Sequence, residues 1–237
     1  MPLLSESDSQ FLRDHFTKSL IKPVKLVFFT QTIACQFCKE TGEILDEVAG
    51  LSDLISVETL NFVTDKEKAE DYAVDKIPAT VVLGEDDYGV RFYGMPSGYE
   101  FTSLVEAIVD VSRGQVDLDA GTRQALANII EPVHMQVFVT PTCPYCPAAV
   151  RLAHKLAIAS DHIRADMVES IEFPHLANKY SVYGVPRTVI NEDVYLEGAA
   201  PEVLVMAKVQ QALGLMTEAE ADAIVAEVTG AGGEGEQ

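Results

Sequence analysis

The sequence predicts an α/β protein built from two tandem copies of one unit, a central mixed sheet flanked by helices with an extra helix in front. The distance from Cys35 to Pro78 and from Cys143 to Pro186 is 43 positions in both cases. Residues 35–81 also align with residues 143–189 without a gap. Short apolar segments of strand length alternate with segments of helical periodicity in both copies, which favours a doubled α/β unit.

Each copy repeats the same order of elements. An amphipathic helix comes first; in the first copy Phe11, Leu12, Phe16 and Leu20 have helical spacing. A buried strand, a cysteine-bearing helix, a second strand, a short helix, a proline step, two further strands and a closing helix follow. The expected ranges are 9–20, 24–30, 35–48, 55–62, 66–72, 80–83, 90–93 and 101–112 in the first copy, and 122–130, 134–140, 143–157, 163–168, 175–180, 188–191, 194–196 and 201–213 in the second.

The polar, Gly-containing stretch 113–119 is the expected connection between the copies. We therefore expect an N-terminal unit over 1–115 and a C-terminal unit over 116–214. The remaining residues, 215–237, are expected to form a short helix and an acidic tail. Thr217 and Glu220 have the spacing of a capping box at the start of that helix. The Gly- and Glu-rich stretch 230–237 is expected to be disordered.

Composition excludes several classes of function. The formal net charge is −20, so phosphate-binding clusters of Lys and Arg are absent, and neither nucleic acid nor an anionic membrane is an expected partner. The N-terminus has no basic segment followed by an apolar one, and no apolar run is long enough to span a bilayer. A cytoplasmic location is therefore expected. In a reducing cytosol, paired cysteines are more often catalytic or metal-binding than structural.

All four cysteines of the chain fall in two Cys-x-x-Cys pairs, Cys35/Cys38 and Cys143/Cys146. At the start of a helix, the first sulfur is exposed to unpaired N–H groups and the helix dipole, which stabilise the thiolate. The second sulfur lies one turn further on and can resolve a mixed disulfide. Cys35 and Cys143 are thus the candidate attacking sulfurs, and Cys38 and Cys146 the candidate resolving sulfurs.

The matching prolines, Pro78 and Pro186, are candidates for cis peptide bonds, because both have the same register relative to a dithiol. Such a bond would leave the backbone of Ile77 and Val185 free to pair with an extended substrate segment. Glu58 and Asp166 occupy equivalent positions in the second strand of each copy and are candidate proton acceptors for the buried sulfurs.

Two other groups of residues are expected to have no special role. Arg187 is expected to be a surface residue, and the five histidines, which lack ligand spacing, are expected to be surface groups.

A metal site is the main alternative for the cysteines. Four cysteines can form a tetrahedral zinc site. Zinc ribbons place their two pairs about 15–20 residues apart, whereas 104 residues lie between Cys38 and Cys143. The spacing favours redox chemistry without a metal, and no cofactor is expected beyond the redox-active disulfides.

Together these motifs resemble the thioredoxin/glutaredoxin superfamily, and the Cys-Pro-Tyr-Cys sequence at 143–146 is typical of glutaredoxins. Two fused copies, each with its own dithiol, resemble the protein disulfide oxidoreductases. The resemblance implies two tandem thioredoxin-like folds joined in one sheet. It also implies reduction, formation or isomerisation of disulfides in client proteins and reduction by a flavin-dependent thioredoxin reductase. A Gly-Gly-x-Asp-type step that helps glutaredoxins hold glutathione is absent: the second copy has Glu197-Gly-Ala-Ala-Pro-Glu202.

The sequence therefore predicts a thiol–disulfide oxidoreductase with two dithiol centres, and two alternatives remain. One is an electron relay between a flavin-dependent reductase and a peroxidase such as a peroxiredoxin, because the N-terminal domain of alkyl hydroperoxide reductase flavoproteins is a similar doubled fold. The other is a zinc or iron–sulfur module that uses the same cysteines.

Overall fold

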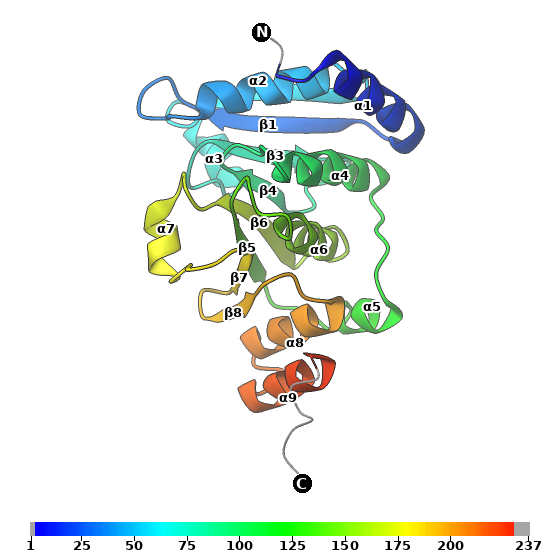
Figure 1. Cartoon of the computed structure of the whole chain (residues 1–237), viewed down its shortest axis with the longest axis vertical. Coiled ribbons are helices and arrows are strands. Elements are labelled where there is room, and N and C mark those ends of the chain that lie inside the picture. Colours follow the sequence, from blue (N-terminus) through cyan, green and yellow to red (C-terminus); the bar gives the residue numbers. More distant parts are fainter. Residues whose placement is uncertain (1–2, 230–237) are drawn as a thin grey trace.

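The computed structural model describes residues 3–229; the tail expected to be disordered, 230–237, lies outside the described residues. The described chain forms one mixed sheet with helices on both faces (Figure 1). The strand order is β2-β1-β3-β4-β6-β5-β7-β8. The first four strands in the chain occupy one half of the sheet and the last four occupy the other. Two tandem thioredoxin-like folds thus share one continuous sheet.

The two halves have the same internal pairing. In each half, the first two strands are parallel to each other. The third strand pairs antiparallel with the first, and the fourth strand pairs antiparallel with the third. The strands are β1 Val24–Thr30, β2 Ile55–Asn61, β3 Ala79–Leu83 and β4 Val90–Tyr93 in the first half, and β5 Val133–Val139, β6 Ile163–Glu169, β7 Arg187–Ile190 and β8 Val194–Glu197 in the second.

The halves meet where β4 pairs in parallel with β6, from Val90 opposite Ala165 to Tyr93 opposite Val168. Because β1, β4, β5 and β6 all run in the same direction, their carboxyl ends lie along one edge of the sheet. The loops that carry both cysteine pairs follow β1 and β5. Both dithiols therefore belong to the same edge of the molecule.

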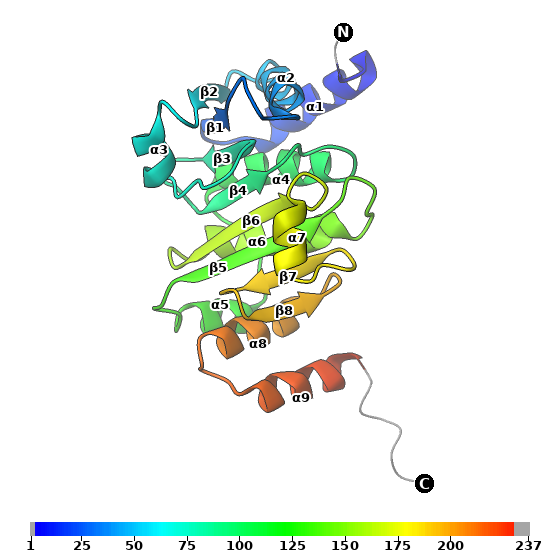
Figure 2. The same ribbon diagram turned by 90° about the vertical axis from the view of Figure 1, so that its left-hand side faces the viewer.

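The helices divide between the two faces of the sheet (Figure 2). One face is covered by the cysteine-bearing helices with α4 between them, together with α1, α5 and α8. The short helices α3 and α7 lie on the opposite face. The bounds are α1 Glu6–Ser19, α2 Cys38–Ala49, α3 Lys66–Asp71, α4 Glu100–Arg113, α5 Ala120–Leu126, α6 Cys146–Ile158, α7 Pro174–Lys179, α8 Glu202–Ala212 and α9 Glu218–Thr229.

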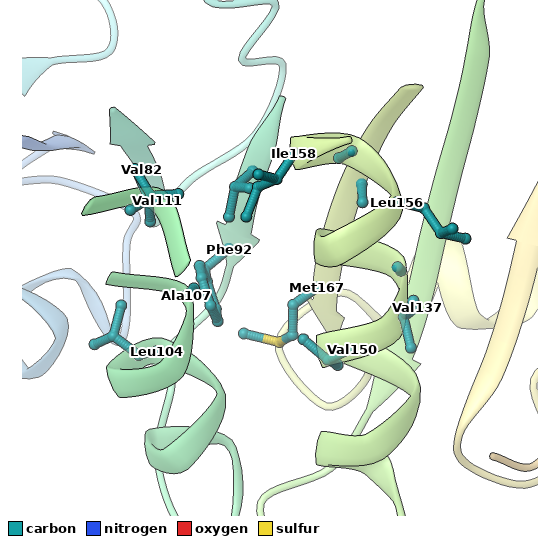
Figure 3. Close-up of a cluster of buried hydrophobic side chains, with 14 of the residues drawn as sticks. Val82, Phe92, Leu104, Ala107, Val111, Val137, Val150, Leu156, Ile158 and Met167 are labelled. Carbon is teal, nitrogen blue, oxygen red and sulfur yellow. The ribbon is translucent and has the colours of Figure 1, made fainter. Parts of the chain in front are cut away.

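The main core lies between the sheet and the layer of long helices. Figure 3 shows Leu104 and Ala107 of α4 near Phe92 of β4, with Met167 of β6 between them and Val150 of α6. Leu104, Phe92, Met167 and Val150 are completely buried. Burial of a large apolar side chain contributes roughly 1.5–3 kcal/mol, so this packing helps to hold the two units together.

The first residues of three helices differ by three positions from the sequence prediction. Helix α1 begins at Glu6 rather than at residue 9, because the Ser5 Oγ caps it by accepting a hydrogen bond from the Asp8 N–H at 3.1 Å. Helices α2 and α6 begin at Cys38 and Cys146, the second cysteine of each pair. The first cysteine of each pair lies in the preceding turn.

The capping box expected at the last helix is present. The Thr217 N–H donates to Glu220 Oε2 at 2.8 Å, and the Glu220 N–H donates to Thr217 Oγ1 at 3.3 Å. Among the helices that the structure describes, none combines the length and the apolar character needed to cross a membrane.

Candidate functional site: two dithiols at helix N-termini

The first dithiol lies in the loop between β1 and α2. Cys35 and Cys38 form a disulfide with a Cα–Cα distance of 5.5 Å. Cys35 is half-buried in the loop, and Cys38 is buried at the first residue of the helix. Ala34, just before the pair, has a positive φ of 60°, so the chain turns sharply to present Cys35 at the helix N-terminus.

The second dithiol occupies the same place between β5 and α6. Cys143 and Cys146 also form a disulfide with a Cα–Cα distance of 5.5 Å. Cys143 is 7% exposed and Cys146 is 0% exposed, so this pair is more enclosed than the first. The Cys143 N–H donates to the Thr140 carbonyl at 3.2 Å, which closes the turn. Pro147 occupies the first helical turn, where an amide hydrogen is not needed.

In both units the first four N–H groups of the helix lack a partner within the helix and point toward the turn that holds the first cysteine. These groups and the helix dipole stabilise negative charge. After reduction, a thiolate at Cys35 or Cys143 therefore lies in the environment that lowers a thiol pKa. The resolving sulfurs, Cys38 and Cys146, are covered by the core. The roles of Cys35 and Cys143 as attacking sulfurs and of Cys38 and Cys146 as resolving sulfurs remain predictions.

The two candidate prolines both follow cis peptide bonds, Ile77–Pro78 and Val185–Pro186. The carbonyl oxygen of Val185 lies 3.6 Å from Cys143 Sγ. Val185 and Ile77 are half-buried, whereas both prolines are buried. The structure thus brings the backbone of Val185 to the second attacking sulfur. A substrate-binding role for Ile77, Pro78, Val185 and Pro186 remains a prediction.

The predicted proton acceptors point away from the sulfurs. Side chains alternate along a strand, and the neighbours of Asp166, Ala165 and Met167, face the cysteine-bearing helices. Asp166 therefore faces the other side of the sheet. In the first unit Val57 packs on the cysteine-helix side, so Glu58 faces away from it as well. The prediction that these carboxylates lie beside the buried sulfurs is wrong.

Both carboxylates are instead held by cations on their own face. Glu58 accepts from Lys68 at 2.7 Å and Lys25 at 3.2 Å, and these bonds lower its pKa. Burial opposes ionisation of Asp166, but hydrogen bonds from His134 and Arg164 outweigh it and hold its pKa below the usual range. Their role is to anchor the strands.

Two further sequence expectations are wrong. Arg187 is buried; it is paired with Glu197 and lies over the Tyr195 ring at 4.3 Å. His154 is also buried, and burial lowers its pKa to about 4, so the neutral ring donates from Nε2 to the Arg91 carbonyl at 3.3 Å. Both residues stabilise the packing around the sheet.

One carboxylate near the second dithiol was missed. Glu100, at the first residue of α4, is 1% exposed, and neither of its carboxylate oxygens has a hydrogen bond. Burial raises its pKa to about 7, although the nearby Ser103 hydroxyl lowers it slightly without making a hydrogen bond of good geometry. The sequence gives little warning, because an acidic residue in a first helical turn is ordinary.

Glu100 lies close to the second cysteine loop. The preceding residue, Tyr99, donates its N–H to the Pro141 carbonyl at 3.0 Å. Helices α4 and α6 start from the carboxyl ends of parallel strands and lie side by side, joined further along by the ion pair of Glu106 and Arg151 at 2.7 Å. The N-terminus of α4 is therefore adjacent to the N-terminus of α6, where Cys146 lies.

Comparison with known proteins agrees with this site. Residues 133–211 match the thioredoxin domain family. The fold and its paired cysteines define the class: a thiol–disulfide redox protein made of two thioredoxin-like units, each with one dithiol.

Within that class, the chain is similar to a protein disulfide oxidoreductase from Aeropyrum pernix, with 29% identity and a TM-score of 0.83 over 90% of this chain and 94% of that one. It is also similar to the N-terminal domain of alkyl hydroperoxide reductase AhpF from Enterococcus faecalis, with 29% identity and a TM-score of 0.80 over 87% of this chain and 99% of that one.

A curated relative is the AhpF component of alkyl hydroperoxide reductase from Pseudomonas aeruginosa, 26% identical over 171 residues. Another is an NADH dehydrogenase of Bacillus subtilis, 26% identical over 170 residues. Each match covers 72% of this chain but 31% of the relative. The chain therefore corresponds to a part of these larger proteins.

Proposed function

We propose that the chain is a protein disulfide oxidoreductase in which each cysteine pair cycles between dithiol and disulfide. The observation that carries this proposal is the placement of both pairs across the turn that begins a helix, with the Val185 carbonyl 3.6 Å from Cys143 Sγ. A substrate segment that binds this backbone would present its disulfide to the attacking sulfur.

The reaction at the second site has two exchange steps. The Cys143 thiolate attacks one sulfur of the substrate disulfide, forms a mixed disulfide and releases one substrate thiolate, which takes up a proton. Cys146 then loses its proton and attacks Cys143 Sγ, which closes the internal disulfide and releases the second substrate thiol. Two electrons pass from the protein to the substrate; one of the two protons comes from Cys146 and the other from solvent, which received it when Cys143 ionised. The reverse sequence oxidises a substrate dithiol.

Glu100 is the group we assign to proton exchange at this site, in place of Asp166. Its buried, unpartnered carboxylate and pKa of about 7 suit a group that takes a proton from the Cys146 thiol and returns it. Glu100→Gln should slow mixed-disulfide resolution and weaken the dependence of its rate on pH near neutrality. A purely structural role would leave the shape of that pH profile unchanged.

Reduction of insulin by dithiothreitol tests the main proposal. The wild-type chain should accelerate insulin precipitation, Cys143→Ser should lose the contribution of the second dithiol, and Cys35→Ser that of the first. The double variant should be no faster than dithiothreitol alone. Ser160→Ala, a change at the far end of α6 from the cysteines, is the control and should match the wild type. Full activity in the double variant would refute the proposal.

We propose that a flavin-dependent thioredoxin reductase regenerates the dithiols by reducing the two disulfides. The compartment is proposed to be a reducing one such as the cytoplasm. The proposed reaction requires no cofactor beyond the two disulfides. The similarity to the AhpF N-terminal domain favours a second candidate, an electron relay to a peroxidase of the peroxiredoxin class. NADPH or NADH oxidation in the presence of a reductase, this chain and either insulin or a peroxiredoxin with peroxide separates the two candidates.

A shared metal is not favoured by the arrangement of the pairs. The strand order places four inter-strand steps between β1 and β5, or roughly 19 Å at about 4.8 Å per step. Zinc–sulfur bonds are about 2.3 Å, so the four sulfurs of one molecule cannot surround one ion.

A further inference from the structure

Three tyrosines in the loops near the second attacking sulfur are largely exposed to solvent. Tyr99, Tyr145 and Tyr183 are 52%, 71% and 95% exposed. Each comes from a different loop at the carboxyl edge of the sheet. Large aromatic side chains that remain this exposed contribute little to the fold, and they are the side chains that most strengthen protein contacts.

Each tyrosine is tied to Cys143 through the backbone. Tyr145 lies between the two cysteines of the pair. Tyr183 lies two residues before Val185, and the Val185 carbonyl oxygen is 3.6 Å from Cys143 Sγ. Tyr99 donates its N–H to the Pro141 carbonyl at 3.0 Å, two residues before Cys143. The three tyrosines therefore belong to loops that meet at one site.

Tyr99 belongs to the first unit, so the rim of the second site is built by both halves of the molecule. The preceding residue, Gly98, has a φ of +60°, and a Cβ there would lie 2.2 Å from the Pro141 oxygen. Only glycine permits this approach. The tight contact fixes Tyr99 beside the second dithiol rather than leaving it on a free loop.

The loop segments that carry the three tyrosines also contain no charged residue, although the Met95 N–H in one of them donates to the Glu172 carboxylate at 2.6 Å. The segments 94–99, 140–149 and 180–186 contain no Asp, Glu, Lys or Arg, although the net charge of the chain is −20. The corresponding loop of the first site, 73–78, contains Asp75 and Lys76, which form an ion pair in which the Asp75 side chain is largely exposed. The two dithiols thus present different surfaces to a partner.

We propose that the second dithiol docks an extended, uncharged peptide segment whose aromatic or apolar side chains flank its disulfide, with Tyr99 and Tyr183 as specificity-determining residues. The proposal rests on the proposed function of the same site. Acidic segments are disfavoured by the field of the whole chain, and a neutral segment loses little solvation when it covers the three rings. The half-buried backbone of Val185 suits an extended partner.

The test isolates the second dithiol in a Cys35→Ser/Cys38→Ser background. Two short synthetic peptides carry the same disulfide loop, flanked in one by Phe, Leu and Ala and in the other by Asp and Glu. The kcat/KM for the aromatic peptide should exceed that for the acidic peptide by about tenfold or more, the size expected when one or two aromatic side chains become buried. In Tyr99→Ala/Tyr183→Ala that ratio should fall several-fold, through KM for the aromatic peptide, to the preference that the field of the chain alone produces.

Ile130→Ala is the matched control, since Ile130 is an exposed apolar residue just before the start of β5, at the opposite edge of the sheet. This variant should keep the ratio of kcat/KM values that the parent shows for the two peptides. An unchanged ratio in the tyrosine variant, or equal use of both peptides by the parent, would overturn the docking proposal. Reduction of hydroxyethyl disulfide by the parent tests the proposed function separately. If that reaction is absent, the exchange chemistry fails rather than the peptide specificity.

Discussion

Gly98 lies where the first unit comes closest to the second dithiol. Any other residue at this position would be destabilised in two ways. Its backbone would be strained by the positive φ, and its Cβ would lie 2.2 Å from the Pro141 oxygen. A Cβ added at Gly121, inside α5, would have no neighbouring atom within 4 Å. A side chain is therefore excluded at Gly98 but has room at Gly121.

Gly98→Ala should lower the free energy of unfolding by about 1–3 kcal/mol, because the new methyl group meets backbone and the conformation is strained. Gly121→Ala should leave it unchanged or raise it by up to about 1 kcal/mol, since alanine is the better helix former. Urea denaturation of both variants measures the difference. Equal stability of the two would show that the Gly98 contact is not needed.

Glu100 should make stability depend on pH. Its pKa is about 7 in the folded chain and lies near 4.5 when unfolded, so between these values the folded state binds the extra proton. The contribution of Glu100 to the free energy of unfolding is fully present below pH 4.5. It falls by about 3 kcal/mol in total as the pH rises through 7. Glu100→Gln should remove that loss.

The measurement is the free energy of unfolding of wild type and Glu100→Gln between pH 4.5 and 8. The difference between them should grow with pH in favour of the variant. Glu6→Gln, at the exposed start of α1, is the control and should follow the wild type. Parallel curves for wild type and Glu100→Gln would contradict the assigned pKa.

At the scale of elements, β4 and β6 carry buried ion pairs on the face away from the dithiols. Arg91 binds Asp87 and the Tyr72 carbonyl, and Arg164 binds Asp166 and the Ala73 carbonyl. Both arginines thus reach the carboxyl end of α3. The seam between the two units is therefore closed by apolar packing on one face, and by apolar packing together with these ion pairs on the other.

Asp166→Asn should lower stability by about 3–5 kcal/mol, the usual effect of leaving a buried partner unpaired. The pKa of Asp166 is below its usual range, so its contribution is present at neutral pH and is lost as the pH falls through that folded-state pKa. Reactivity of the Cys143 thiolate should not change, because Asp166 faces the other side of the sheet.

Glu58→Gln is the matched control, because Glu58 holds the equivalent position in the first unit and its partners are half-exposed. This substitution should lower stability much less than Asp166→Asn does. Thermal unfolding and the rate of alkylation of reduced Cys143 give the two readouts. A slower alkylation in Asp166→Asn would restore the proton-acceptor role predicted from the sequence.

For the whole molecule, the continuous sheet separates the two dithiols. They share an edge and a face, yet the four strand steps between β1 and β5 and helix α4 lie between them. Disulfide exchange needs sulfurs in contact, and packed layers do not close a gap of roughly 19 Å. Electrons should therefore pass between the two centres through a second molecule or a partner.

Cys38→Ser/Cys146→Ser, which keeps only the two attacking sulfurs, tests this separation. Mild oxidation should give disulfide-linked dimers whose yield rises with protein concentration. Cys35→Ser/Cys38→Ser should instead close its remaining pair within one chain at any concentration. A Cys35–Cys143 disulfide within a monomer, identified by mass spectrometry, would show that the units separate and that an internal relay operates.

The sequence by itself determined the doubling, the order of elements and the four cysteines, because these depend on local periodicity and on a spacing that repeats without gaps. It also identified Pro78 and Pro186, which share one register. Tertiary structure decided the rest. Which face Asp166 occupies depends on strand pairing, and the burial of Glu100, Arg187 and His154 depends on how the units pack. The meeting of Gly98 with Pro141 joins residues 43 positions apart, a contact that arises only when β4 and β6 pair and that no local pattern encodes.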